Sequence, residues 1–211
     1  MRLYDYAASG NCYKVRLLLG LLGRQYDGVP VDIFAGDTLT AEFARLNPAR
    51  ETPVLELSDG AVVVQSNAIL CYLAEGTVYM PADALGRAQV AQWLHFEQER
   101  IMRGIGAARF FVLTGRQPQL VDERRALGAT GLDMLEAQLD GRRFLVGDHP
   151  TVADIANFAY TSRAADAHIE LDRWPAVQAW LARVRALPGF VDEYIRYPDN
   201  ARPGRGRSIY G

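Results

Sequence analysis

The chain has 211 residues, 49% of them hydrophobic and 23% charged, which is typical of a globular protein with one large or two small domains. A formal net charge of −2 gives no general attraction to nucleic acid or to an anionic membrane, and no apolar run is long enough to span a bilayer. Cys12 and Cys71 are too few for a disulfide scaffold, and the three histidines lie far from either cysteine, so we expect a reduced, cytoplasmic protein with no secretory signal and no metal site.

Strands and helices alternate at the start of the chain. Residues 2–6 (RLYDY) and 29–34 (VPVDIF) predict strands, and residues 13–23 (YKVRLLLGLLG) predict a helix with one apolar face and Gly23 as its C-terminal stop. A strand, a crossover helix and a strand of these lengths predict a right-handed βαβ unit. Residues 41–47 predict a short helix.

The following segment favours antiparallel pairing. Residues 53–57 and 61–64 are apolar runs on either side of an Asp-Gly pair, which is a strong hairpin signal. Residues 66–75 predict a helix with Ser66 as its N-cap and an apolar face made of Ile69, Tyr72 and Leu73. The order βαβ, helix, ββα is the thioredoxin-like layout.

Everything after a Gly- and Pro-containing linker reads as helical. Apolar residues at helical spacing predict helices over residues 86–113, 123–139, 151–166 and 175–187. Antiparallel packing of such helices gives a bundle. We therefore expect a thioredoxin-like domain over residues 1–75, a linker over 76–85, an all-helical domain over 86–196 and an irregular basic tail over 197–211, solvated on the surface.

Four stretches in this order carry a resemblance: LYDYAASGNCYKVRLLL (3–19), NPARETPVLEL (47–57), QSNAILCYLAE (65–75) and FLVGDHPTVADIA (144–156). Over roughly residues 1–196 the chain resembles the cytosolic glutathione transferase family, of a serine/asparagine, bacterial-like type. The resemblance implies an α/β thioredoxin-like N-terminal domain followed by an all-α helical bundle. It also implies a cytoplasmic homodimer with a role in detoxification, which uses glutathione as co-substrate and needs no metal.

The resemblance implies Ser9 and Asn11 as the catalytic residues. In serine-type members a hydroxyl after the first strand donates a hydrogen bond to the glutathione sulfur, and Ser9 matches it. Members with disulfide-bond reductase activity resemble S/T-x-N-x-x-K, which this chain matches as Ser9, Asn11 and Lys14. There the asparagine amide also faces the sulfur, and an amide is a competent donor. The sequence leaves open which of the two dominates, and Asn11 also fits as a helix cap.

Cys12 is the alternative nucleophile, because a cysteine at a helix N-terminus can have a depressed pKa. Its spacing groups it instead with Val15 and Leu19 on the packed face, and no second cysteine stands at C-x-x-C spacing. We interpret Cys12 as a core residue. Cys71, inside an apolar helix, is also expected to be core.

The resemblance implies a glutathione site made of Glu51, Thr52, Pro53, Gln65 and Ser66. A cis Thr52–Pro53 bond would leave the Thr52 backbone open to pair with the cysteinyl backbone of glutathione. A hydroxyl and free N–H groups at a helix start suit the γ-glutamyl carboxylate, which would place it at Gln65 and Ser66.

Two residues depart from the family pattern. Glu51 stands where many relatives have lysine, so the residue that binds the glycyl carboxylate is open, with Arg45 and Arg50 as candidates. Asn67 stands where many relatives are apolar. Thr151 and Asp154, in contrast, fit a capping motif, and we assign Asp154 to stability.

The second substrate is a small electrophile or a disulfide that the sequence does not identify. The residues that could contact this substrate, judged only from their position on the first long helix of the bundle, are Arg103, Arg109, Phe110 and Phe111. We expect a glutathione transferase that activates the thiolate of bound glutathione. The alternatives are a glutathione-dependent disulfide-bond reductase and a non-catalytic binding or assembly module of the same architecture. We expect no nucleic-acid or membrane partner.

Overall fold

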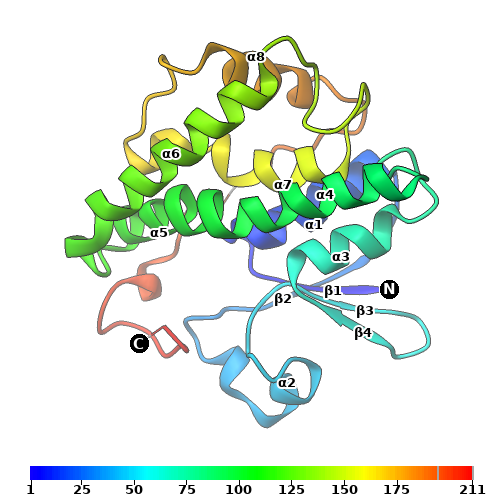
Figure 1. Ribbon diagram of the computed structural model, residues 1–211. Coiled ribbons are helices and arrows are strands. Elements are labelled where there is room, and N and C mark those ends of the chain that lie inside the picture. Colours follow the sequence, from blue (N-terminus) through cyan, green and yellow to red (C-terminus); the bar gives the residue numbers. More distant parts are fainter. Residues whose placement is uncertain (194, 211) are drawn as a thin grey trace. The chain divides into compact units, whose positions relative to one another are not determined.

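A computed structural model describes residues 1–193 and 195–210 (Figure 1). By its internal contacts the chain divides into two units. The first is Met1–Leu73 together with the segment that begins at Val191, and the second is Ala74–Phe190. We call residues 191–210 the C-terminal segment. No helix in the described part of the chain is long and apolar enough to cross a membrane.

The first unit contains a four-stranded mixed sheet in the order β2-β1-β3-β4. Its elements are β1 (Arg2–Asp5), α1 (Gly10–Leu21), β2 (Asp27–Pro30), α2 (Ala41–Leu46), β3 (Val54–Glu56), β4 (Val62–Val64) and α3 (Ser66–Ala74). Strand β1 pairs in parallel with β2 and antiparallel with β3, and β3 pairs antiparallel with β4. Figure 1 shows α1 and α3 on one face of the sheet and α2 on the other. The predicted thioredoxin-like layout is confirmed.

Alternation along β1 gives each face of the sheet its own core. Leu3 is fully buried, whereas Tyr4 points to the opposite face and meets the ring of Phe43 on α2 edge-on at 6.3 Å. Phe43 belongs to a buried cluster with Val31 and Val54. Both faces of the sheet are therefore covered by apolar packing.

Helix α1 begins at Gly10, three residues before the predicted start. Ser9 explains the difference, because its Oγ accepts the N–H of Cys12 at 3.3 Å and its carbonyl accepts the N–H of Tyr13 at 3.0 Å. At the other end Gly23 has a φ of 61°, and the N–H of Arg24 bonds the carbonyl of Leu19 at 3.0 Å. Gly23 thus stops the helix as predicted.

Helix α3 departs from two expectations. Ser66 is its first helical residue rather than its N-cap, because the carbonyl of Gln65 already accepts the N–H of Ile69 at 3.0 Å. Tyr72 is 48% exposed and does not share the buried face of Ile69. Cys71 is half-buried rather than core. When a helix has apolar residues on most sides, its sequence does not show which face is buried.

The second unit is helical, as predicted. Its longer elements are α4 (Ala84–Phe96), η2 (Glu97–Gly106), α5 (Ala107–Thr114), α6 (Val121–Leu139), α7 (Val152–Thr161) and α8 (Pro175–Arg185). The expected uninterrupted α-helix over residues 86–113 is wrong in its middle, because η2 is a π-helix. Ten residues of apolar spacing do not distinguish a π turn from an α turn.

The predicted capping motif at α7 is present. The Thr151 hydroxyl accepts the N–H of Ala153 at 3.3 Å, and Asp154 accepts the N–H of Thr151 at 2.9 Å. The fully buried Asp154 carboxylate also accepts the Leu145 N–H and the Trp180 indole N–H, both at 2.9 Å. Asp154 therefore joins the start of α7 to a loop and to α8, a structural role.

Candidate functional site

The loop between β1 and α1 places Ser9 at the entry of the helix. Its Oγ accepts the Cys12 N–H, and its hydroxyl faces the fully buried Cys12 thiol, from which it can rotate toward an acceptor on a ligand. Helix capping and hydrogen-bond donation to a ligand are therefore compatible roles for Ser9. The free N–H groups of the first turn also favour a negative charge at this place.

Asn11 lies in a polar cluster around Lys14. The ammonium of Lys14, with no exposed surface, donates to Asn11 Oδ1 at 2.9 Å, and Ser66 Oγ donates to the same oxygen at 3.4 Å. Because two donors occupy Oδ1, the NH2 group of Asn11 is directed away from the cluster. The amide therefore presents donors on the side opposite Lys14.

Lys14 is the last residue of the S/T-x-N-x-x-K match, and the sequence predicts no role for it. It also donates to Ser66 Oγ at 3.4 Å and to Asn67 Oδ1 at 3.5 Å, so α1 and the start of α3 are joined at this point. Asn67 stands where many relatives have an apolar residue, and the structure explains it as a hydrogen-bond acceptor for the Lys14 ammonium. One signal was available, because Lys14 is the only lysine of the chain.

Residues 51–53 form the loop before β3. The Thr52–Pro53 peptide is cis, as the resemblance implied. The side chain of Asn47 holds the loop by donating to the Glu51 carbonyl at 2.8 Å. Neither the N–H nor the C=O of Thr52 forms a hydrogen bond with any residue that the structure describes, so this backbone edge can pair with an extended ligand.

Gln65 connects this loop to the start of α3. Its Nε2 lies 3.4 Å from Glu51 Oε2, and its φ of 70° is uncommon for a residue other than glycine. Next to Glu51, Arg50 also has a positive φ and donates to the Thr38 carbonyl at 3.1 Å. The Arg50 guanidinium is therefore partly engaged by its own unit.

The predicted residues are brought together by these contacts. Ser9 is joined to Thr52 through Cys12, whose thiol interacts with the Thr52 hydroxyl. Asn11 is joined to Ser66 directly, and Glu51 is joined to Gln65. Side-chain contacts thus connect the loop after β1 to the loop before β3 and to the first turn of α3.

Cys12 has the surroundings of a core residue. It has no exposed surface, and burial followed by the charge of Asp5 raises its pKa to about 12, although hydrogen bonds from Thr52, the Tyr6 N–H and Ser9 oppose the shift. At neutral pH this thiol is protonated and therefore a weak nucleophile.

The residues expected to contact the second substrate lie in the second unit. Arg109 is almost fully buried and forms an ion pair with Asp166 at 2.8 Å, and Arg103 pairs with Glu99 at 3.2 Å on the exposed side of η2. Arg109 is thus a structural residue of this unit. Phe110 and Phe111 are partly buried neighbours with ring centres 5.8 Å apart.

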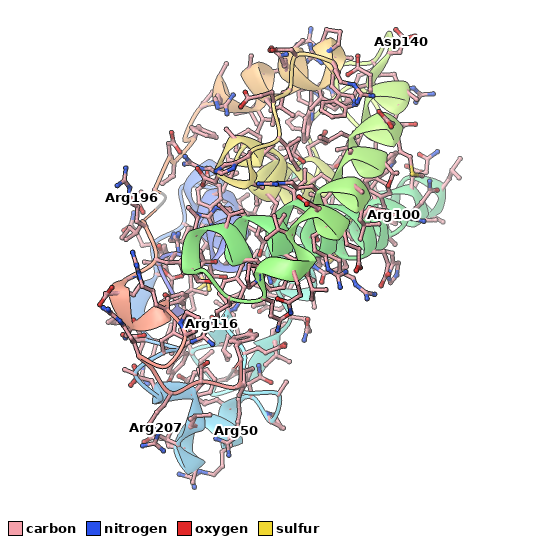
Figure 2. All side chains as sticks on the ribbon, turned by 90° about the vertical axis from the view of Figure 1, so that its left-hand side faces the viewer. Arg50, Arg100, Arg116, Asp140, Arg196 and Arg207 are labelled. Carbon is pink, nitrogen blue, oxygen red and sulfur yellow. The ribbon has the colours of Figure 1, made fainter. Side chains whose placement is uncertain are left out.

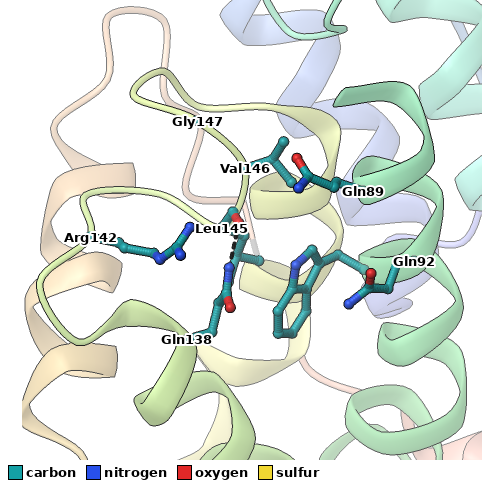
Figure 3. A pocket seen from close by; sticks show the side chains of 8 residues that line it. Gln89, Gln92, Gln138, Arg142, Leu145, Val146 and Gly147 are labelled. Atoms are coloured by element: carbon teal, nitrogen blue, oxygen red, sulfur yellow. Dashed lines mark hydrogen bonds between the residues drawn. The ribbon is translucent and has the colours of Figure 1, made fainter. Parts of the chain in front are cut away.

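A separate cavity of about 160 Å³ lies wholly within the second unit (Figure 3). Its lining residues are Gln89, Gln92, Trp93, Gln138, Arg142, Leu145, Val146 and Gly147. The Gln138 amide donates to the carbonyl of Leu145, another lining residue, at 2.9 Å. None of the predicted site residues lines this cavity. No cluster of His, Cys, Asp or Glu suited to a metal ion occurs among the residues that the structure describes.

Comparison with known proteins gives two family matches. The family described as "Glutathione S-transferase, N-terminal domain" matches residues 8–75, and "Glutathione S-transferase, C-terminal domain" matches residues 118–183. A crystal structure of a glutathione S-transferase from Pseudomonas fluorescens aligns with a TM-score of 0.88 and 41% identity, covering 91% of this chain and 98% of that one.

Two curated relatives carry more specific names. The maleylacetoacetate isomerase of Rhizobium meliloti is 32% identical over 219 residues, covering 95% of this chain and 97% of the relative. The disulfide-bond oxidoreductase YfcG of Escherichia coli is 27% identical over 192 residues, covering 87% and 89%.

Proposed function

The chain belongs to the glutathione S-transferase family, and from that premise we propose that it binds reduced glutathione at Ser9, Asn11, Glu51–Pro53, Gln65 and Ser66 and holds the bound thiol as a thiolate. The thiolate then attacks a small electrophile. The protein itself forms no covalent bond with either substrate.

One observation carries this proposal. The Asn11 amide oxygen is engaged by Lys14 and Ser66, so that its NH2 group presents donors. The Ser9 hydroxyl, whose oxygen accepts the Cys12 N–H, can turn from the Cys12 thiol to donate to a ligand. A free thiol has a pKa of about 8.5 and is mostly protonated at neutral pH. Donors aimed at the sulfur favour the anion, and each unit by which they lower the pKa corresponds to about 1.4 kcal/mol.

The remaining residues would orient the ligand. The open backbone of Thr52 suits antiparallel pairing with the cysteinyl residue, and the start of α3 suits the γ-glutamyl carboxylate. When glutathione binds in this way, its thiol ionises and the proton is released to solvent. Positioning and thiolate stabilisation are then the chain's whole contribution to the chemistry.

Asn11 favours a second candidate, a glutathione-dependent disulfide-bond reductase. In that reaction the bound thiolate attacks a disulfide sulfur and displaces the other sulfur as a thiolate. The similarity to the Escherichia coli disulfide-bond oxidoreductase supports keeping this candidate. Parallel assays with a chloronitroarene and with a small alkyl disulfide distinguish the two, because only the second consumes two equivalents of glutathione.

The first test is a titration with reduced glutathione at neutral pH that records heat and ultraviolet thiolate absorbance. We expect binding with thiolate formation, and we expect Ser9→Ala or Asn11→Ala to raise the pKa of the bound thiol by about one unit, a tenfold change in its ionisation constant. The pH dependence of the absorbance measures this shift.

Two variants control the titration. Ser58→Ala removes an exposed hydroxyl in the β3–β4 turn and should leave the bound thiol unchanged. Cys12→Ala should retain thiolate formation, whereas a loss confined to Cys12→Ala would favour the cysteine nucleophile. Absence of binding at millimolar glutathione would refute the enzyme proposal in favour of a binding or assembly module.

A further inference from the structure

The cavity of Figure 3 brings together hydrogen-bond donors that the protein itself does not use. Its lining includes the Trp93 indole, the Arg142 guanidinium and the side-chain amides of Gln89 and Gln92. None of these donors bonds or pairs with any residue that the structure describes. Figure 3 shows Arg142 on one side of the cavity and Gln89 and Gln92 on the other, so donors reach the space from two elements.

Trp93 is the most constrained of these donors. The residue is only 7% exposed, and its indole N–H has no partner in the described part of the chain. The other two tryptophans of the chain both satisfy this group with a carboxylate. Trp174 donates to Asp133 at 2.8 Å, and Trp180 donates to Asp154 at 2.9 Å. Because an unsatisfied buried donor is costly, the Trp93 N–H requires an acceptor that occupies the cavity.

The charge of the lining favours an anion. Arg142 is the only charged residue among those that line the cavity, and no Asp or Glu is among them. The acidic residue nearest to Arg142 along the chain is Asp140, which lies exposed at the end of α6 and outside the lining (Figure 2). A negatively charged ligand therefore meets a guanidinium in this cavity and no carboxylate.

The loop that carries Arg142 is held in place from two helices. From α8, Arg183 donates to the Arg143 carbonyl at 3.0 Å and to the Arg142 carbonyl at 3.4 Å. From α6, the Gln138 amide donates to the Leu145 carbonyl at 2.9 Å. The backbone beneath the Arg142 side chain is thus fixed, so the guanidinium needs only rotamer changes to reach a ligand.

We propose that this cavity is a binding site for a small organic carboxylate. The carboxylate accepts hydrogen bonds from Arg142 and from the Trp93 N–H, and a short apolar chain lies against the buried residues Leu145 and Val146. The volume of about 160 Å³ suits a molecule the size of propionate rather than a peptide. Because no residue of the proposed glutathione site lines the cavity, this inference does not depend on the proposed function.

The test follows the indole N–H signals of the full chain by heteronuclear NMR, with Trp93→Phe identifying the Trp93 signal. Sodium propionate is the probe, propionamide is its uncharged counterpart, and sodium chloride at the same ionic strength is the salt control. Arg142→Met removes the guanidinium from the lining. Arg143→Met is the matched control, because it removes the same charge from an exposed neighbour outside the lining.

We expect propionate to shift the Trp93 signal to saturation and to leave those of Trp174 and Trp180 in place, because their N–H groups already have acceptors. Arg142→Met should weaken propionate binding about tenfold, and propionamide should bind about tenfold more weakly than propionate, since each change removes a charge-assisted hydrogen bond. Arg143→Met should change the Kd less than about twofold.

Three results would overturn the inference. Equal weakening by the two arginine variants, or a shift that rises linearly with propionate concentration, would mean an adventitious ion only. Equal binding of propionamide would mean that the site does not recognise the carboxylate. An unmoved Trp93 signal would mean that water alone satisfies the indole N–H. The glutathione titration is a separate measurement, so its failure would refute the proposed function and leave this inference standing.

Discussion

Lys14 shows how a single side chain positions several others. Its ammonium has three side-chain oxygens within 3.5 Å, on Asn11, Ser66 and Asn67. A tetrahedral ammonium suits three separate acceptors, whereas the planar guanidinium of arginine does not. Lys14 therefore fixes which side of the Asn11 amide faces the proposed ligand.

Lys14→Met keeps most of the side-chain volume and removes the donors. We expect a loss of about 1–3 kcal/mol in the free energy of unfolding, since the oxygens lose their donor, and a higher pKa of bound glutathione because the Asn11 amide is free to turn over. Denaturant unfolding and the thiolate titration measure the two effects. Lys14→Arg should not rescue either, and a rescue would contradict the geometric argument.

Among individual residues, motifs predicted most of the candidate site. The family resemblance implied Ser9, Asn11 and Ser66, and the structure places all three at the start of a helix. Lys14 and Asn67 were not recognised as partners, because their contact joins helices 52 residues apart in the chain and has no local pattern. The packing of Tyr197 on Tyr6 and of Tyr210 on Phe34 was not predicted for the same reason, since nothing in a basic, glycine-containing tail indicates where its aromatic rings pack.

At the element scale, η2 and α6 approach through two glycines. A Cβ added to Gly104 would lie 2.6 Å from the Cα of Gly128, whereas one added to Gly131 would lie 3.0 Å from the tip of the Ile101 side chain and 3.2 Å from the Cβ of Arg100. Backbone cannot move aside as a flexible side chain can. Gly104 is therefore required by packing.

Gly104→Ala should lower the free energy of unfolding by about 1–3 kcal/mol, although alanine is the better helix former. Gly131→Ala is the matched variant on the facing helix and should cost clearly less. Denaturant unfolding monitored by circular dichroism measures both. Equal effects of the two substitutions would contradict the close approach as the cause.

The apolar periodicity predicted that the second unit is helical, but it did not predict that part of the helix over residues 86–113 is a π-helix. The capping residues Thr151 and Asp154 were readable because a capping box is a local motif. The π-helix over Glu97–Gly106 was not, because apolar spacing over ten residues is the same for a π turn and an α turn. In the first unit, the Asp-Gly turn between β3 and β4 was equally local and correctly predicted.

At the scale of the whole molecule, we expect two copies to associate, with the bundle of one chain against the thioredoxin-like half of the other. Both units carry exposed apolar side chains that suit such an interface. They include Tyr72 in the first unit and Val78, Leu85 and Met134 in the second.

Sedimentation velocity should give a dimer at micromolar concentration. Tyr72→Glu or Leu85→Glu should shift it toward monomer, because a charge would be buried in the interface. Leu113→Glu, at another exposed apolar residue of the helical unit, is the control and should leave the dimer intact. A strictly monomeric wild type at high concentration would contradict the expectation.

The return of residues 191–210 to the first unit has a consequence for synthesis on the ribosome. The strands and helices of residues 1–73 emerge first, yet their covering segment is translated only after the whole of residues 74–190. During that interval the nascent chain can pair its sheet, but Tyr6 and Phe34 lack the rings that later cover them. The helical unit is translated as one uninterrupted stretch and can complete itself first, so the half that is made earlier is the one that finishes folding later.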